Sequence, residues 1–301
     1  MSHFILPAKN DIKNSFNRAA STYDEAAFLQ REIGDRLLQR LDYIKLSPQR
    51  LLDLGCGTGY VTSKLGTRYP QAEIVALDLA AEMVACTRRQ LDTGPWLKRL
   101  FGKMPARHYL CADAEHIPLA GTTTDLIFSN LALQWCNPEN VFCEALRVLS
   151  PGGLLMFTTF GPDTLKELRA AFSSIDEKPH VNVFIDMHDL GDLLVHAGFA
   201  DPVMDMEILT LTYSELKTLL QELKQIGARN VMPGRNQGLM GRQAWARIVQ
   251  GYEKFRTQGK LPATYEVIYG HAWKPLRTVQ KSVEGQQVIG LDEFREMTRK
   301  K

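Results

Sequence analysis

The stretch that decides the fold is LLDLGCGTGY, residues 51–60, in which a short apolar run leads into three alternating glycines. The run predicts a buried β-strand, and the glycines predict a turn that another group approaches closely. A dinucleotide-binding turn has its third glycine one position later, where this chain has Tyr60, and a Walker loop needs a lysine that is missing here. The turn therefore indicates close backbone approach and gives no clear signal for phosphate.

Strands and helices alternate through the rest of the chain. Strands are predicted at residues 50–55, 72–78, 108–113, 124–130, 154–160, 202–209 and 264–273. Helices are predicted between them at residues 61–69, 80–91, 140–149, 165–172 and 187–199, with further helical stretches at 11–45 and 214–258. This alternation indicates a parallel sheet covered by helices on both faces, with right-handed crossovers.

Polar side chains stand at the carboxyl ends of the first four predicted strands. They are Asp53, Asp78, Asp113 and Asn130. Open α/β sheets bind ligands outside these ends, so we expect the four side chains to surround one site. Asp53 is placed to accept hydrogen bonds from the amides of the glycine turn. Asp78, 19 residues after Gly59, stands where a carboxylate binds two ribose hydroxyls, and Asp113 stands where an acid accepts from an adenine amino group.

The order D-L-G-C-G-T-G, Asp78 with Met83 five residues on, A-D-A, F-S-N and L-S-P-G-G resembles the class I S-adenosylmethionine-dependent methyltransferases over residues 50–160. The resemblance implies a doubly wound, seven-stranded, mostly parallel, Rossmann-like sheet. It also implies that the glycine turn lies under the methionine part of S-adenosylmethionine, that Asp78 holds the ribose, and that Asp113 meets the adenine. Asn130 would lie near the methionine end. Met83 would pack on the adenine, although a plain core position explains it equally.

The implied cofactor-binding set follows from these matches, and no metal site is expected. The set consists of Asp53, Gly55, Cys56, Gly57, Gly59, Asp78, Leu79, Met83, Asp113, Ala114 and Asn130.

Further segments narrow the resemblance. They include FNRAASTYDEAAFLQR near the start, SNLALQWC after the fourth strand, and GRNQGLMGR and YGHAW near the end. Together they are similar to the malonyl-acyl-carrier-protein O-methyltransferases of biotin synthesis, from about Lys13 to Pro275. This implies one methyltransferase domain over residues 1–301, with a helical cap at 11–45, a cofactor-binding core at 50–160 and a substrate- or carrier-docking insertion at 214–258. Residues 92–107 are longer than this family leads us to expect, and residues 276–301 match no segment of it.

The reaction implied is methyl transfer to the free carboxylate of malonyl-acyl-carrier-protein, giving the malonyl methyl ester that primes pimeloyl synthesis. A carboxylate with a pKa of about 4 is ionised at neutral pH, so no general base is needed. The enzyme has to align the reactants and exclude water. A hydroxyl or cation must meet the carboxylate, and Arg169 is the first candidate because arginine binds carboxylates in a bidentate way. The full candidate set is Tyr23, Arg169, Gln134 and Arg18.

Charge is unevenly distributed along the chain. Residues 208–301 contain 16 Lys and Arg against 8 Asp and Glu, a net of +8, in a chain whose net charge is +2. This favours an acidic partner, although solvated helix faces explain it equally. Acyl carrier protein is strongly acidic, so the resemblance makes it the expected partner, with Lys224, Arg235 and Arg242 as docking candidates. No Arg/Lys cluster is interleaved with aromatic residues, so nucleic acid is not expected.

The spacing of the cysteines and the hydropathy of the chain indicate in which cellular compartment the protein is expected. The five cysteines form no C-x-x-C pair, which disfavours a disulfide framework or a zinc site and favours a reduced compartment. The start of the chain becomes charged too early for a secretory signal, and no apolar run reaches the ~20 residues of a membrane span. We expect a cytoplasmic monomer that binds no membrane.

Three other functions fit parts of the sequence. A methyltransferase of another small carboxylic acid or metabolite would have the same cofactor half. A cofactor-binding assembly factor, or a relative that hydroxylates protein arginine, would keep the fold without transferring methyl. An NAD-dependent oxidoreductase is disfavoured by Tyr60.

Overall fold

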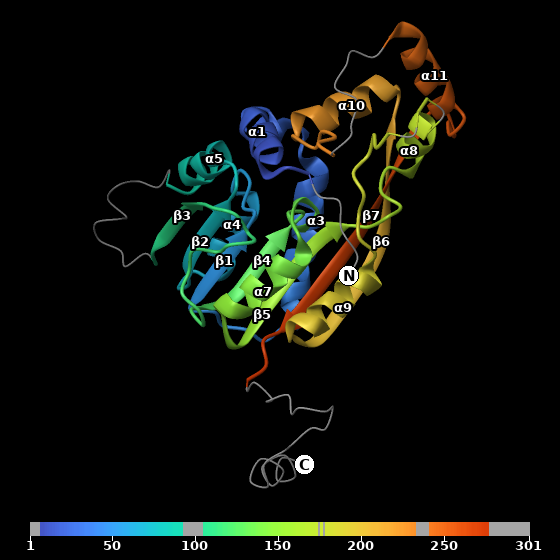
Figure 1. Ribbon diagram of the computed structural model, residues 1–301. Coiled ribbons are helices and arrows are strands. Elements are labelled where there is room, and N and C mark those ends of the chain that lie inside the picture. Colours follow the sequence, from blue (N-terminus) through green and yellow to red (C-terminus); the bar gives the residue numbers. More distant parts are fainter. Residues whose placement is uncertain (1–6, 93–104, 174, 177, 233–240, 277–301) are drawn as a thin grey trace, which may run out of the picture.

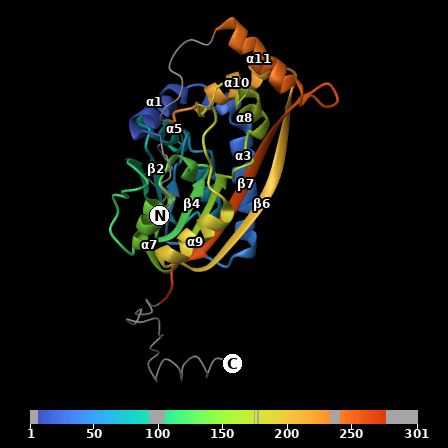
Figure 2. The same cartoon turned by 45° about the vertical axis from the view of Figure 1, so that its right-hand side comes forward.

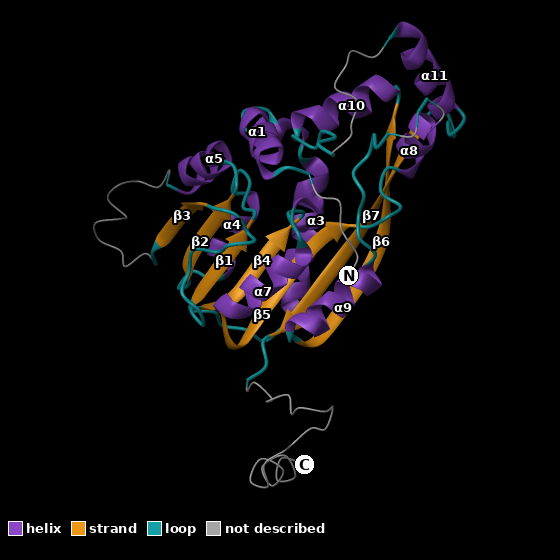
Figure 3. Ribbon diagram, in the orientation of Figure 1, coloured by secondary structure: helices purple, strands orange, loops and turns teal. Residues whose placement is uncertain are grey.

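The computed structural model describes residues 7–92, 105–173, 175–176, 178–232 and 241–276. Its centre is a seven-stranded sheet with the order β3-β2-β1-β4-β5-β7-β6 (Figures 1 and 3). The strands are β1 (Arg50–Leu54), β2 (Glu73–Asp78), β3 (Arg107–Cys111), β4 (Thr124–Asn130), β5 (Leu149–Phe160), β6 (Ala200–Tyr213) and β7 (Leu261–Trp273). β7 runs antiparallel to β5 and β6, and the pairs among β1 to β5 are parallel. The predicted doubly wound, mostly parallel sheet is confirmed.

Helices cover both faces of this sheet (Figure 3). They include α3 (Phe28–Arg40), α4 (Tyr60–Arg68), α5 (Ala81–Leu91), α7 (Pro138–Val148) and α9 (Met187–Ala197). Leu51 of β1 belongs to the apolar cluster that contains α3 and α4, whereas its neighbour Leu52 belongs to the cluster that contains α7 and α9. Successive side chains of a strand point to opposite faces, so β1 is buried on both sides and its apolar residues Leu51 and Leu52 are adjacent.

The N-terminal stretch that we predicted as one helix over 11–45 is divided into pieces. It contains α1 (Lys9–Ala19), α2 (Tyr23–Ala26), α3 and a short 3-10 turn at Leu41–Tyr43. The chain turns at Thr22, whose hydroxyl donates to the carbonyls of Ala19 (3.2 Å) and Gln225 (3.1 Å). This division lets α3 pack on the sheet while α1 lies above the carboxyl ends of the strands (Figure 1).

The late insertion contains two helices among its described residues. It contains α10 (Leu216–Gln225) and α11 (Arg242–Glu253), and α11 packs on α8 (Lys166–Ser173). The turn after α10 meets the N-terminal helices, because the Ser15 hydroxyl donates to the Gly227 carbonyl at 2.9 Å and Ile226 is buried with Ala26. Figures 1 and 2 both show α10 beside α1. Residues 9–26 and 216–228 thus form a roof over the edge of the sheet.

Two sequence features lie mainly outside the described residues. Of the stretch 92–107, the structure describes Asp92 and residues 105–107, and of the tail 276–301 it describes Leu276. Within the part of the chain that is described, no helix combines the length and the apolar character needed to cross a membrane.

Candidate active site

The three glycines after β1 serve two different purposes. A Cβ on Gly55 (φ +83°) would lie 2.3 Å from the Cβ of Ala132, and a Cβ on Gly59 (φ +97°) would lie 3.0 Å from the Cα of Thr87. Both glycines therefore permit close packing of neighbouring segments. A Cβ on Gly57 (φ +55°) would meet nothing within 4 Å. Gly57 is thus the glycine whose missing side chain leaves room for a ligand, whereas Gly59 faces α5.

Asp78 holds the glycine turn, a role that we had expected of Asp53. One oxygen of Asp78 accepts from the Gly57 amide at 3.0 Å, and the other accepts from the Ala80 amide at 2.8 Å. Asp53 instead accepts from the Thr62 hydroxyl of α4 at 2.5 Å, so the expectation that it binds the amides of the turn is wrong. Burial raises the pKa of Asp78 to about 6 and that of Asp53, which also lies near Asp78, to about 7.

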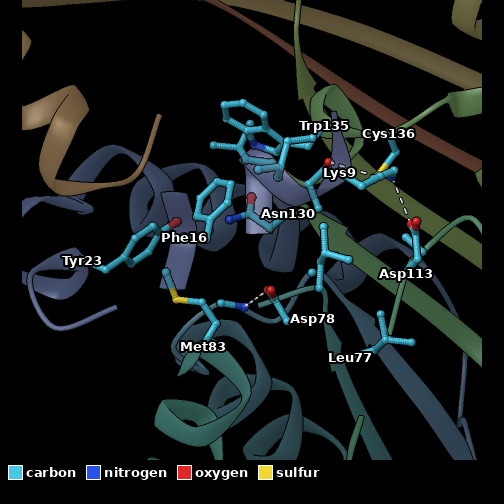
Figure 4. Close-up of a pocket in the computed structure, with 17 residues that line it drawn as sticks. Lys9, Phe16, Tyr23, Leu77, Asp78, Met83, Asp113, Asn130, Trp135 and Cys136 are labelled. Carbon is cyan, nitrogen blue, oxygen red and sulfur yellow. Dashed lines mark hydrogen bonds and ion pairs between the residues drawn. The ribbon is translucent and has the colours of Figure 1, made fainter. Parts of the chain in front are cut away.

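A cavity of about 640 Å³, counted with its open mouth, lies between the turn and the roof. We call it the main cavity because most of the predicted site residues line it, and not for its size, since a cavity beside Gln134 and Phe160 measures about 1040 Å³. Predicted residues that line it are Gly55, Gly57, Asp78, Leu79, Met83, Asp113, Ala114 and Asn130. Figure 4 shows Tyr23 and Asp113 on opposite sides of it, with Asp78 and Asn130 between them. Four strand ends therefore contribute to one site. Cys56 and Asp53 line a smaller cavity next to it.

Lys9 closes the Asp113 side of the main cavity. Its ammonium lies 3.0 Å from Asp113 Oδ1 (Figure 4). The same ammonium lies 2.5 Å from Glu115 Oε1. The two ion pairs join the first turn of α1 to the loop after β3, so they attach the roof to the edge of the sheet near Asp113. No sequence pattern pointed to Lys9, because it lies ahead of the helical periodicity and 104 residues from Asp113.

Two smaller cavities adjoin the main cavity. The glycine-turn cavity is lined by residues that include Tyr23, Gln30, Arg31, Asp53, Cys56, Gly57 and Asn130. The roof cavity is lined by residues that include Phe16, Tyr23, Gln30, Gln134, Trp135, Phe160, Asn182 and Ile226. Tyr23 lines all three cavities. The three spaces therefore meet at its side chain.

Comparison with known proteins places this chain in a family. The profile of a methyltransferase domain matches residues 52–157. A malonyl-[acyl-carrier protein] O-methyltransferase of Gallionella capsiferriformans is 53% identical, over 96% of this chain and 98% of the relative. The corresponding protein of Laribacter hongkongensis is 55% identical, over 96% of this chain and 97% of the relative. The chain belongs to the malonyl-[acyl-carrier protein] O-methyltransferase family.

A solved structure supports the fold. The crystal structure of a methyltransferase from Bacillus halodurans C-125 has a TM-score of 0.54 with 17% identity, and the match covers 80% of this chain and 98% of that one. At this identity the likeness shows the fold alone.

Two of the four candidates for carboxylate recognition line a cavity. Burial raises the pKa of Tyr23, and the nearby carboxylates of Asp78 and Asp24 raise it further, so its phenol stays protonated and can donate a hydrogen bond. Gln134 lines the roof cavity, but its amide donates to the Leu131 carbonyl at 2.7 Å and accepts from the Thr159 hydroxyl at 3.3 Å. Both the NH₂ group and the oxygen of the Gln134 carboxamide are thus already hydrogen-bonded within the protein.

The two arginine candidates lie outside these three cavities. Arg18 is exposed on α1 and donates to the Asn14 carbonyl of its own helix at 3.0 Å. Arg169 is exposed on α8, where its guanidinium donates to the carbonyls of Pro162 (2.9 Å) and Thr164 (3.1 Å). Thr164 lines the roof cavity, so Arg169 braces the wall of that cavity from outside. Arg169, the first candidate for binding the carboxylate, therefore stabilises the wall of the roof cavity and does not line the cavity itself.

The docking candidates are exposed where they are described. Lys224 lies on α10 and Arg242 begins α11, and neither forms an ion pair with another described residue. Arg235 falls outside the described residues. Other exposed cations among the described residues of the insertion are Lys217, Arg229, Arg247 and Lys254. Exposed cations for which the described residues offer no ion-pair partner thus lie on both α10 and α11.

Aromatic side chains that sequence reasoning did not assign complete the walls. Phe16 of α1 and Trp135, in the 3-10 turn after β4, pack edge to face with ring centroids 5.3 Å apart. Both line the main cavity and the roof cavity. Both residues stand in the segments FNRAA and LQWC, which carried the resemblance to the family. The sequence thus marked these segments but did not indicate that the two side chains line a cavity. Among the described residues, no group of three or more His, Cys, Asp and Glu side chains is arranged to hold a metal ion.

Proposed function

We propose that this protein transfers a methyl group from S-adenosylmethionine to the free carboxylate of malonyl-acyl-carrier-protein, giving the methyl ester that primes pimeloyl synthesis. The observation that carries the proposal is the meeting of three cavities at Tyr23, since a methyl donor and its acceptor need adjoining sites. The names of relatives that share half of this sequence support the choice of substrate. We include in the proposal that the protein is a cytoplasmic monomer.

The residues of the main and glycine-turn cavities fit the donor. Gly57 leaves open space beside the turn, and Met83 presents an apolar surface that is 1% exposed. Each oxygen of Asp78 accepts one amide and retains a lone pair for a hydroxyl. When bound, S-adenosylmethionine supplies a methyl group on a positively charged sulfur. Asp78 would hold its ribose, Asp113 its adenine, and the glycine turn its methionine part.

The acceptor would enter the roof cavity. Its carboxylate oxygen forms the new C–O bond while the C–S bond of the donor breaks, with the electron pair staying on sulfur. No proton moves, so no base is required. Tyr23 would donate to the acceptor, and the aromatic wall of Phe16, Trp135 and Phe160 would exclude water and strengthen the attraction between the opposite charges.

Product mass tests the proposed reaction. The protein is incubated with S-adenosylmethionine and malonyl-acyl-carrier-protein, and the carrier is then weighed by mass spectrometry. We expect a gain of one methyl group that mild base removes, as an ester requires. Malonyl-CoA and free malonate run as competitors separate a carrier-bound substrate from a small carboxylic acid. No gain on the carrier, with methylation of a free acid instead, would overturn the proposal.

The insertion is proposed to dock the acidic carrier. Changing Lys224 and Arg242 together to glutamate is expected to raise the KM for malonyl-acyl-carrier-protein about tenfold at low salt, because the steering charges are reversed. The KM for malonyl-CoA, measured in the same assay, should change much less. The difference should shrink as salt is added, since exposed charges are screened.

The control for docking is Lys45→Glu, a reversal of one exposed charge between α3 and β1. Its KM for the carrier-bound substrate should match that of the unchanged protein. If the double variant and this control give the same KM, the carrier does not dock on α10 and α11.

A further inference from the structure

Gln30 of α3 stands where the donor and acceptor spaces meet. It lines both the glycine-turn cavity and the roof cavity, and Tyr23 is the other residue that lines both. Its carboxamide oxygen Oε1 is buried and has no hydrogen-bond partner among the described residues. A buried polar atom without a partner is unfavourable and rare, so its position next to two ligand cavities needs a reason.

The backbone around Gln30 is tied to the sheet. Its carbonyl accepts from Asn130 Nδ2 at 2.9 Å, and Asn130 Oδ1 accepts from the Thr158 hydroxyl at 2.8 Å. One turn further along α3, a Cβ on Gly34 would lie 2.8 Å from Val61, so the absence of a side chain there lets the helix lie this close. Gln30 is therefore carried by a fixed helix at the ends of β4 and β5. A side chain that orients reactants needs a backbone held in one position in this way.

We propose that Gln30 is a catalytic residue that bridges the two reactants, an inference that rests on the proposed function. Its carboxamide oxygen, which carries a partial negative charge, faces the positively charged sulfur and methyl group of the donor. Its NH₂ group donates a hydrogen bond to the carboxylate of the acceptor. A neutral amide thus contacts a cation on one side and an anion on the other. An arginine at this place would attract the carboxylate but repel the donor.

Neither of the other two amides near the roof cavity fits this role. Gln134 is engaged at both ends, as described above. Asn182 also has a buried oxygen without a partner among the described residues, but it lines the roof cavity and not the glycine-turn cavity. Gln30 is therefore placed to touch both reactants, whereas Asn182 is placed to meet the acceptor alone.

Ligand affinities test the donor side without any acceptor. Gln30→Met keeps the length of the side chain and removes the amide, and calorimetry gives its affinity for S-adenosylmethionine and for the uncharged product S-adenosylhomocysteine. We expect about fivefold weaker binding of S-adenosylmethionine, the effect of one lost hydrogen-bond-like interaction, and unchanged binding of S-adenosylhomocysteine. Gln30→Glu should increase the preference for the charged ligand. Equal weakening of both ligands by Gln30→Met would indicate a structural role and overturn the proposal.

Kinetics test the acceptor side. We expect Gln30→Met to lower kcat/KM for malonyl-acyl-carrier-protein about 30-fold, and Gln30→Glu to raise the KM because it places a second negative charge beside the carboxylate. Gln39→Met, the same change at an exposed position of α3, is the matched control and should leave both parameters unchanged. Unaltered kinetics in Gln30→Met would overturn the proposal. If the unchanged protein does not methylate the carrier at all, the proposed function fails, while the ratio of the two ligand affinities still decides the role of Gln30.

Discussion

Replacing Gly55 with alanine is expected to lower the free energy of unfolding by about 2–5 kcal/mol, the sum of overpacking and a left-handed backbone. The new Cβ would lie 2.3 Å from the Cβ of Ala132, closer than two carbon atoms that are not bonded to each other can approach, and φ at this position is +83°. Both costs arise at the junction of β1 with the loop after β4. Urea unfolding followed by circular dichroism measures the loss.

A second substitution separates the two costs of Gly55→Ala. Ala132→Gly removes the atom that clashes, so the double variant should recover the packing part and keep about 1–2 kcal/mol of backbone cost. Gly57→Ala is the matched comparison, because its Cβ meets no atom within 4 Å. It should be less destabilised than Gly55→Ala yet bind S-adenosylmethionine poorly, since the methyl group enters the ligand space. A double variant no more stable than Gly55→Ala would contradict this account.

Replacing Asp78 with asparagine is expected to weaken binding of S-adenosylmethionine about 100-fold, equivalent to losing two hydrogen bonds of about 1–1.5 kcal/mol each. Asparagine has one acceptor oxygen, so it cannot accept from both the Gly57 and the Ala80 amides and still serve a ribose hydroxyl. Calorimetric titration of the purified variant measures the affinity. Unfolding in urea, run in parallel, shows whether the turn itself remains folded.

The same carboxylate should make donor binding depend on pH. Burial raises the pKa of Asp78 to about 6, and the ionised form is the one that accepts all of these hydrogen bonds. Below pH 6 a proton must leave on binding, so affinity should rise with pH up to about 6 and then level off. Asp78→Asn should lose this rise. Asp53→Asn should keep it, because burial raises the pKa of Asp53 to about 7 and Asp53 is already protonated there. An unchanged rise in Asp78→Asn would assign the titration to another group.

Local pattern was sufficient to predict the sheet and one side of the site. Apolar runs of strand length alternate with segments in which apolar residues recur at helical spacing. Few arrangements of strands and helices bury all the apolar faces of such a chain. Asp78, Asp113 and Asn130 follow consecutive strands, and parallel strands end at one edge, so their meeting around the main cavity follows from chain order. The roles of Gly55 and Gly59 as points of close approach follow in the same way, since few residues other than glycine adopt a positive φ at low cost.

The tertiary structure decided the rest of the site, because it depends on contacts between residues far apart in the chain. The positions of the two acids decide which one holds the glycine turn. Asp53 accepts a hydrogen bond from Thr62, whereas Asp78 accepts one from the amide of Gly57. The helical stretch 11–45 is broken at Thr22, which bonds to Gln225, 203 residues away. Lys9 is paired with Asp113 across 104 residues, and Gln30 faces two cavities only because α3 is tied to the end of β4. The sequence by itself therefore determined the strands, the glycine turn and the strand ends around the main cavity. The roof, and the junction between the glycine-turn cavity and the roof cavity, exist only once distant segments have packed together.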